Sequence, residues 1–81
     1  MTVTRPKTAR ESRIRVFNKE LILDAALEIF STYGFRGSTV SQIADLADMS
    51  KPNLLYYFRR KEDIYVAVLN RTLEMWLRTA T

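Results

Sequence analysis

Residues 50–62 read SKPNLLYYFRRKE, and this stretch decides the fold. Ser50 has a side chain favoured at helix N-caps, and Pro52 is tolerated in a first turn because its missing amide hydrogen would be unpaired there. The apolar residues that follow are four positions apart and are expected to face a core: Leu54 and Phe58. The pattern predicts a short helix over residues 51–57.

A second short helix is predicted just upstream. Residues 39–42 read TVSQ and match a capping box, in which the side chains of Thr39 and Gln42 bond each other's backbone amides. Behind the box, one apolar face consists of Val40, Ile43, Ala44 and Ala47. A helix of about eight residues is stable only when packed against others. Two such helices joined by a turn form a helix-turn-helix, whose second helix enters the major groove of DNA.

A longer helix is expected on each side of this pair. Over residues 19–33, apolar residues recur at steps of three and four: Ile22, Ala25, Ala26, Ile29, Phe30 and Tyr33. Asn18 is the expected N-cap and Gly34 the expected stop. From Lys61 to at least Leu77 the apolar residues are too many for one face. The core is expected to take Ile64, Tyr65 and Val68, which leaves outside Val66, Leu69, Leu73, Trp76 and Leu77. The fold class is therefore all-α, a three-helix bundle with a helix-turn-helix plus the start of a long fourth helix.

The charge is concentrated at the N-terminal end. The chain has 81 residues, with 13 Lys and Arg against 9 Asp and Glu, and a net charge of +4. The excess lies within residues 1–17, where the single acid Glu11 accompanies Arg5, Lys7, Arg10, Arg13 and Arg15. Few large apolar residues and Pro6 predict that residues 1–17 form a mobile basic arm, which can end in a helix. A basic excess favours a polyanionic partner, either nucleic acid or an acidic membrane face.

The composition disfavours several classes of protein. The chain has no Cys and no His, which removes the usual zinc ligands, a thiol nucleophile and an imidazole base. We expect no catalytic residues, no metal and no cofactor, and an enzyme is the least favoured class. Since no apolar run has the length of a signal-peptide core or a membrane span, a cytoplasmic location is expected.

The helix-turn-helix residues also resemble a known family. Residues 50–62, preceded by GSTV at 37–40 and by Ile43-Ala44, are similar to the DNA-binding domain of TetR-family transcriptional regulators. The first long helix has the matching spacing of Ala25, Ala26, Phe30 and Gly34, and the resemblance covers residues 18–78. It implies a repressor that acts as a homodimer on a palindromic operator. It also implies a larger all-helical domain for ligand binding and dimerisation, absent from these 81 residues, which would cover the outer face of the last helix and hold an inducer.

Three residues depart from the family pattern. The family often has Tyr in place of Leu55, usually Gly in place of Asp48, and commonly Ser or Thr in place of Arg60. Asp48 is tolerable in its turn, because Asp adopts left-handed conformations more readily than most residues. Arg60 gives up a cap worth about 1 kcal/mol but adds a charge beside the expected phosphate site. The runs at 53–58 and 74–77 are most similar to the pyrimidine-utilisation (RutR-like) subgroup, which responds to uracil or thymine.

Residue chemistry and the resemblance together predict the DNA contacts: Thr39, Ser41, Gln42, Lys51, Pro52, Asn53, Leu55, Tyr56, Tyr57 and Lys61. Lys61 would reach a phosphate at a helix N-terminus, as the family's lysine does at this position. The hydroxyls of Tyr56 and Tyr57 would donate to phosphate oxygens. Lys51 suits guanine and Asn53 suits adenine. In the arm, minor-groove contacts are expected from Arg10, Arg13 and Arg15.

Simpler interpretations stay open. A solvated surface accounts for the charges from Lys51 to Lys61, core packing accounts for Tyr56 and Tyr57, and a disordered solubilising tail accounts for the arm. Two other function classes also remain. One is a helical protein-interaction module, motivated by the surplus apolar face. The other is a basic helix on an anionic membrane, which is weaker because the first long helix needs its apolar face for the core.

Overall fold

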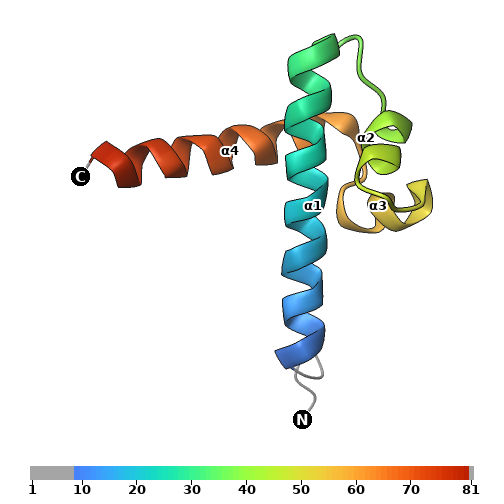
Figure 1. Ribbon diagram of the computed structural model, residues 1–81, viewed down its shortest axis with the longest axis horizontal. Helices are drawn as coiled ribbons and strands as arrows, with labels where there is room; N and C mark the ends of the chain where they lie inside the picture. The colour runs from blue at the N-terminus through green and yellow to red at the C-terminus, as the bar shows by residue number, and fades with distance from the viewer. Residues whose placement is uncertain (1–8, 81) are drawn as a thin grey trace.

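The computed structural model describes residues 9–80, which form four α-helices and no strand. The helices are α1 (Ala9–Tyr33), α2 (Val40–Leu46), α3 (Lys51–Tyr57) and α4 (Lys61–Ala80). Helices α2 and α3 lie on one side of α1, whereas α4 crosses α1 and extends away on the other side (Figure 1). The all-α prediction is confirmed, and the predicted range of α3 is the observed one.

The core lies where α1, α2, α3 and the first half of α4 meet. Its buried apolar residues are Ile22, Leu23, Ala25, Ala26, Ile43, Ala44, Ala47, Leu54, Ile64 and Val68. The alanines of α1 and α2 leave room for these two helices to approach closely. The apolar spacing predicted for residues 19–33 included Tyr33, but this part of the prediction is wrong. Tyr33 is 54% exposed in the last turn of α1, beyond the bundle, and does not belong to the core. Tyr65 is also more exposed than predicted, although its ring lies edge-on to Phe30, 5.4 Å between centroids.

The first helix begins ten residues earlier than predicted. It starts at Ala9, so Asn18 lies in mid-helix and is not an N-cap. Residues 9–17 of the predicted mobile arm are therefore helical; residues 1–8 of that arm lie outside the described residues. Two causes extend the helix. Arg and Glu are good helix formers, and adding a turn to an existing helix avoids the unfavourable nucleation step.

The predicted caps of the two short helices are present. The Thr39 side chain accepts a hydrogen bond from the Gln42 amide, 3.1 Å, and the Thr39 amide donates to Gln42 Oε1, 2.8 Å. Ser50 Oγ accepts from the Asn53 amide at 3.2 Å. These bonds satisfy amides that have no partner inside the helix, which fixes where α2 and α3 begin.

The turns depend on two residues in the left-handed region. Gly34 ends α1 with φ of 78°, and Asp48 lies between α2 and α3 with φ of 58°. Asp48 therefore adopts the conformation for which the family usually has Gly. Between α1 and α2, an added Cβ at Gly37 would collide with the backbone carbonyl of Tyr33, so only glycine fits this turn without a backbone shift.

Helix α4 is attached to α1 by an ion-pair cluster. Arg71 Nη1 donates to Glu20 Oε1 at 2.8 Å and to Asp24 Oδ1 at 2.9 Å. Burial alone would lower the pKa of Arg71, but the hydrogen bonds and charges of the two carboxylates outweigh it and raise that pKa above its ordinary value. The apolar residues of α4 that were predicted to lie outside the core are all exposed: Val66, Leu69, Leu73, Trp76 and Leu77.

Candidate nucleic-acid interface

The first turn of α3 is the most accessible polar segment of the helix-turn-helix. Lys51, Pro52 and Asn53 are all exposed, whereas Leu54 beneath them is completely buried. Since Leu54 fixes the inner face of α3, Pro52 lies on the opposite face and Asn53 on one side, and both are exposed. Leu55 is half-buried at the side of the helix. A polar helix start held on a rigid core is the geometry that base-edge contacts require.

The start of α2 has fewer side-chain groups available for contacts outside the protein. Thr39 and Ser41 are exposed, but the Thr39 hydroxyl already accepts from Gln42 in the capping box. Gln42 is half-buried and its carbonyl oxygen accepts from the Thr39 amide. The side-chain NH₂ of Gln42 remains available to donate to an acceptor outside the protein. A bidentate contact to adenine also needs the side-chain oxygen, so it would require the capping box to open.

The two tyrosines of α3 are connected to α1. Their rings pack edge to face, 5.2 Å between centroids. Tyr57 Oη accepts a hydrogen bond from Asn18 Nδ2 at 2.9 Å, and Tyr56 Oη accepts from Arg15 Nη2 at 3.4 Å. Each hydroxyl therefore keeps its own proton for donation. Tyr57 is half-buried and packs against the core, whereas Tyr56 is 69% exposed. Tyr57 thus has the packing role that was the simpler interpretation, in addition to an available hydroxyl.

Lys61 is turned toward the connection between α1 and α2. Its Nζ donates to the carbonyl oxygen of Phe35 at 2.6 Å and to that of Ser38 at 3.0 Å, and lies 4.2 Å from the centroid of the Phe35 ring. Two of its three N–H groups are thus engaged within the protein, so the expected phosphate contact would use the third. Sequence reasoning missed this role because the accepting carbonyls are backbone groups more than 20 residues away in the chain.

The three arginines of the arm that were predicted to contact DNA, Arg10, Arg13 and Arg15, are on helix α1, which sets the side of the helix from which each projects. At 100° per residue, Arg15 lies on the side of α1 that meets α3, whereas Arg10 and Arg13 point elsewhere. Lys19 follows Arg15 by one turn on the same side. A shallow hollow between the two helices is lined by Arg15, Lys19, Tyr56 and Tyr57. Sequence reasoning missed Lys19 and Asn18; their spacing from Arg15 would have indicated them only once the helix was known to extend through this region.

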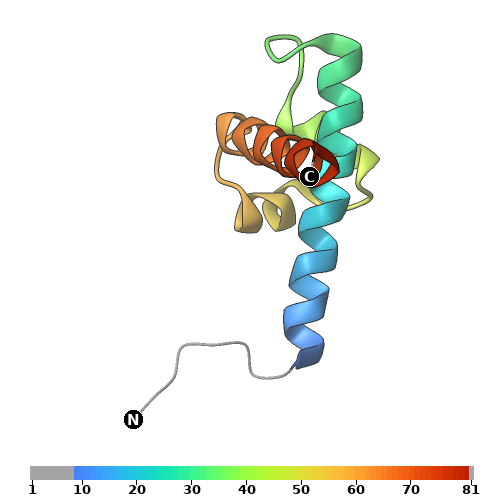
Figure 2. The same ribbon diagram turned by 90° about the vertical axis from the view of Figure 1, so that its left-hand side faces the viewer.

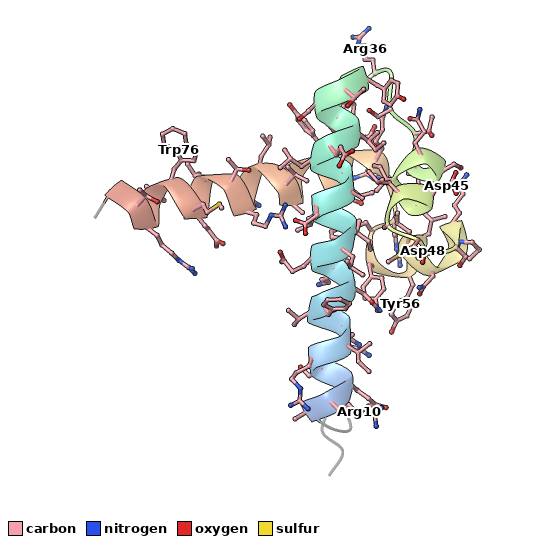
Figure 3. All side chains as sticks on the ribbon, viewed as in Figure 1. Arg10, Arg36, Asp45, Asp48, Tyr56 and Trp76 are labelled. Carbon is pink, nitrogen blue, oxygen red and sulfur yellow. The ribbon has the colours of Figure 1, made fainter. Side chains whose placement is uncertain are left out.

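The labelled acids of the helix-turn-helix lie away from the start of α1. Figure 3 shows Asp45 on α2 and Asp48 in the following turn, whereas Glu11 is one helical turn before Arg15 on the same side of α1. Arg60 is paired with Asp63 at 3.3 Å. Within residues 9–80, no group of three or more His, Cys, Asp or Glu side chains is arranged to hold a metal ion. Among the same residues, none of the helices has the length and apolar character needed to cross a membrane.

Residues 22–68 match the sequence model of a family described as bacterial regulatory proteins, tetR family. The chain belongs to the TetR family. It is 51% identical over 70 residues, or 86% of its length, to the HTH-type transcriptional regulator RutR of Escherichia coli K12. Over 58 residues, 72% of the chain, it is 36% identical to the HTH-type transcriptional regulator QacR of Staphylococcus aureus. It is also 39% identical over 51 residues, 63% of the chain, to the HTH-type transcriptional repressor NicS of Pseudomonas putida.

The matched segment corresponds to the DNA-binding domain of TetR-family regulators, and it contains the whole of α2 and α3. The aligned regions cover 33%, 31% and 24% of RutR, QacR and NicS, so the chain spans a third or less of these relatives. The identity to RutR supports the predicted RutR-like subgroup.

Proposed function

We propose that the chain is the sequence-specific DNA-binding domain of a TetR-like transcriptional repressor that acts as a dimer on a palindromic operator. The observation that supports this most directly is the first turn of α3, where Lys51, Pro52 and Asn53 are exposed above the buried Leu54. In a helix-turn-helix this turn meets the base edges of the major groove. The repressor works in the cytoplasm and performs no catalysis.

The contacts divide by chemistry. Lys51 donates to guanine, Asn53 pairs with adenine, and the half-buried Leu55 touches a thymine methyl group. The phosphate backbone is contacted by Thr39, Ser41, Pro52, Tyr56, Tyr57 and the remaining N–H of Lys61. Gln42 contributes its NH₂ group. Backbone contacts of this kind fix the register of the helix, and base contacts supply the sequence preference.

Control by a ligand belongs to a further domain. The exposed apolar side of α4, which includes Leu73 and Trp76, provides a surface for the all-helical dimerisation domain. The resemblance to the pyrimidine-utilisation regulators points to a pyrimidine as the inducer. Binding in that domain would act by changing the separation of the two α3 helices, because two half-sites one helical turn apart must be engaged together.

Selection of duplexes from a random pool by the full-length protein, followed by fluorescence anisotropy, tests the function. We expect tight, salt-dependent binding to a palindromic sequence. Asn53→Ala and Lys51→Met should change the preferred sequence at single positions and cost about 1–3 kcal/mol for the selected duplex. Arg36→Gln is the matched control for charge, since Arg36 follows the C-terminal end of α1 and lies away from Tyr56 (Figure 3). Failure to bind any duplex below about 50 mM salt, where phosphate contacts are strongest, contradicts the proposal.

A protein-interaction module is the second candidate, and the exposed side of α4 is the observation that favours it. In that case Leu73→Gln or Trp76→Gln would abolish binding of a protein partner, while no duplex would be bound at any salt concentration.

A further inference from the structure

The N-terminal half of α1 projects beyond the helix-turn-helix (Figures 1 and 2). In both views it extends past α2 and α3 as a single helix with no other element alongside its end (Figures 1 and 2). Only its inner side approaches another helix, at the C-terminal end of α3. There Arg15 and Asn18 donate to the hydroxyls of Tyr56 and Tyr57, so the helix is held at a fixed place beside α3.

The hollow at this junction consists of hydrogen-bond donors. Its lining residues are Arg15, Lys19, Tyr56 and Tyr57. The guanidinium of Arg15 and the ammonium of Lys19 are hydrogen-bond donors only, and they lie one helical turn apart. Both phenol oxygens accept from α1, which leaves their protons to point outward. The edge-to-face packing of the two rings fixes the hydroxyl positions. Two cations and two hydroxyl donors suit a phosphate group, which is anionic and accepts through several oxygens.

The location of the hollow identifies the source of the phosphate. Tyr56 and Tyr57 form the last turn of α3, whose first turn carries Lys51 and Asn53. If the first turn lies in the major groove, the last turn and the adjoining side of α1 face the strand that borders the groove. Asp45 and Asp48 lie away from the start of α1 (Figure 3), and the acid on the same side of α1 as Arg15 is Glu11, one helical turn earlier.

We propose that Arg15 and Lys19, together with the hydroxyls of Tyr56 and Tyr57, bind a phosphodiester of the duplex beside the groove entered by α3. Helix α1 is then a second DNA-binding element outside the helix-turn-helix, and Arg15 contacts the backbone rather than minor-groove base edges. This inference rests on the proposed function, because the ligand is the same duplex. It places the two tyrosines, already assigned to the phosphate backbone, in one phosphate-binding site together with two cations of α1.

Salt dependence of binding by the full-length protein tests the site. Each phosphate contact contributes about 0.9 to the slope of log K against log salt concentration. The proposed dimer has this one-phosphate site in each protomer, so the double variant Arg15→Gln/Lys19→Gln removes two phosphate contacts and should lower the slope by about 1.8. Raising salt from about 50 to 200 mM should then weaken binding about tenfold less than in the wild type. The loss should be equal for the selected operator and for a duplex of random sequence, and for A·T-rich and G·C-rich flanks.

Two comparison variants make the result specific. Arg36→Gln removes the same charge away from the hollow and should leave the slope nearly unchanged. Arg15→Lys keeps the charge and should keep the slope, which separates loss of charge from damage to the fold. A double variant with the same slope as Arg36→Gln overturns the inference while leaving the proposed function intact. An effect of Arg15→Gln confined to A·T-rich flanks also overturns it, because minor-groove insertion would be the cause. No binding by the wild type would contradict the proposed function itself.

Discussion

The Nζ atom of Lys61, the first residue of α4, lies 2.6 Å from the backbone carbonyl oxygen of Phe35 in the connection between α1 and α2. A second hydrogen bond to the Ser38 carbonyl oxygen and the nearby Phe35 ring complete the contact. The lysine thus links the start of α4 to the segment that leads into α2. A side chain expected to bind DNA also stabilises the geometry of the helix-turn-helix.

We expect Lys61→Met to lower the free energy of unfolding by about 1.5–3 kcal/mol, because it leaves two carbonyl groups without a charged donor. Urea denaturation monitored by circular dichroism measures the change. Lys51→Met is the matched control: Lys51 is exposed at the start of α3, so its replacement should alter stability by less than about 0.5 kcal/mol. Equal stability of the two variants would show that the Lys61 contacts do not stabilise the fold.

The contact of Arg71 with Glu20 and Asp24 should have a small effect, since both carboxylates are more than half exposed. A double-mutant cycle between Arg71→Met and Asp24→Asn is expected to give a coupling energy of about 0.2–1 kcal/mol that falls as salt is raised. A coupling energy of zero at low salt would contradict this.

The raised pKa of Arg71 fixes the sign of its pH dependence. A basic group whose pKa is higher in the folded state contributes its full stability below its unfolded pKa and loses it as pH rises through the folded value. Both values lie far above neutrality. The stability difference between wild type and Arg71→Met should therefore not decline between about pH 7 and 10. A steady decline across this range would show that another group controls the contact.

The capping box of α2 can be tested by substitution. Thr39→Ala removes the acceptor for the Gln42 amide and should lower the free energy of unfolding by about 1 kcal/mol, with a fall in Tm of about 4–8 °C. Thr39→Ser keeps the hydroxyl and should retain most of the stability. Ser41→Ala, at an exposed position in the same helix, is the control and should change Tm little. A lower Tm for Ser41→Ala than for Thr39→Ala in scanning calorimetry would contradict the capping argument.

Asp48 tests the turn between α2 and α3. Its φ of 58° is accessible to Gly and tolerable for Asp, but unfavourable for a β-branched side chain. We expect Asp48→Gly to be at least as stable as the wild type and Asp48→Val to be less stable by about 1–2 kcal/mol. Guanidinium denaturation of the two variants measures the difference. A valine variant as stable as the glycine variant would show that the turn changes conformation.

Features encoded by neighbouring residues could be predicted from the sequence. Thr39 with Gln42, and Ser50 with Asn53, form caps across three residues, so local pattern was sufficient to find both helix starts. The left-handed turn at Asp48 was expected from the resemblance, because the family usually has Gly at this position, and Asp48 has the positive φ that this implies. The exposed first turn of α3 follows from its cap and from the apolar spacing behind it.

Features that depend on partners far away in the chain could not be predicted from the sequence. The helix over residues 9–17 has no apolar period to indicate it. Arg15, within this segment, and Asn18, just after it, form hydrogen bonds with α3 residues about 40 positions away. Lys61 depends in the same way on carbonyl groups in the α1–α2 connection. Tyr33 continues the apolar spacing of α1, but periodicity does not indicate where a helix leaves the bundle. These errors concern the surroundings of the candidate site rather than α3 itself.

Trp76 is the only tryptophan in the chain, and it is 72% exposed on α4. Because the core contains no indole, the emission of Trp76 is already that of a water-exposed ring in the folded chain, and melting of the core would shift it little. The emission of Trp76 would shift to the blue only when an apolar surface covers the outer side of α4 and excludes water from the ring. The chain therefore carries an intrinsic fluorophore for the docking of α4, separate from any signal of its folding.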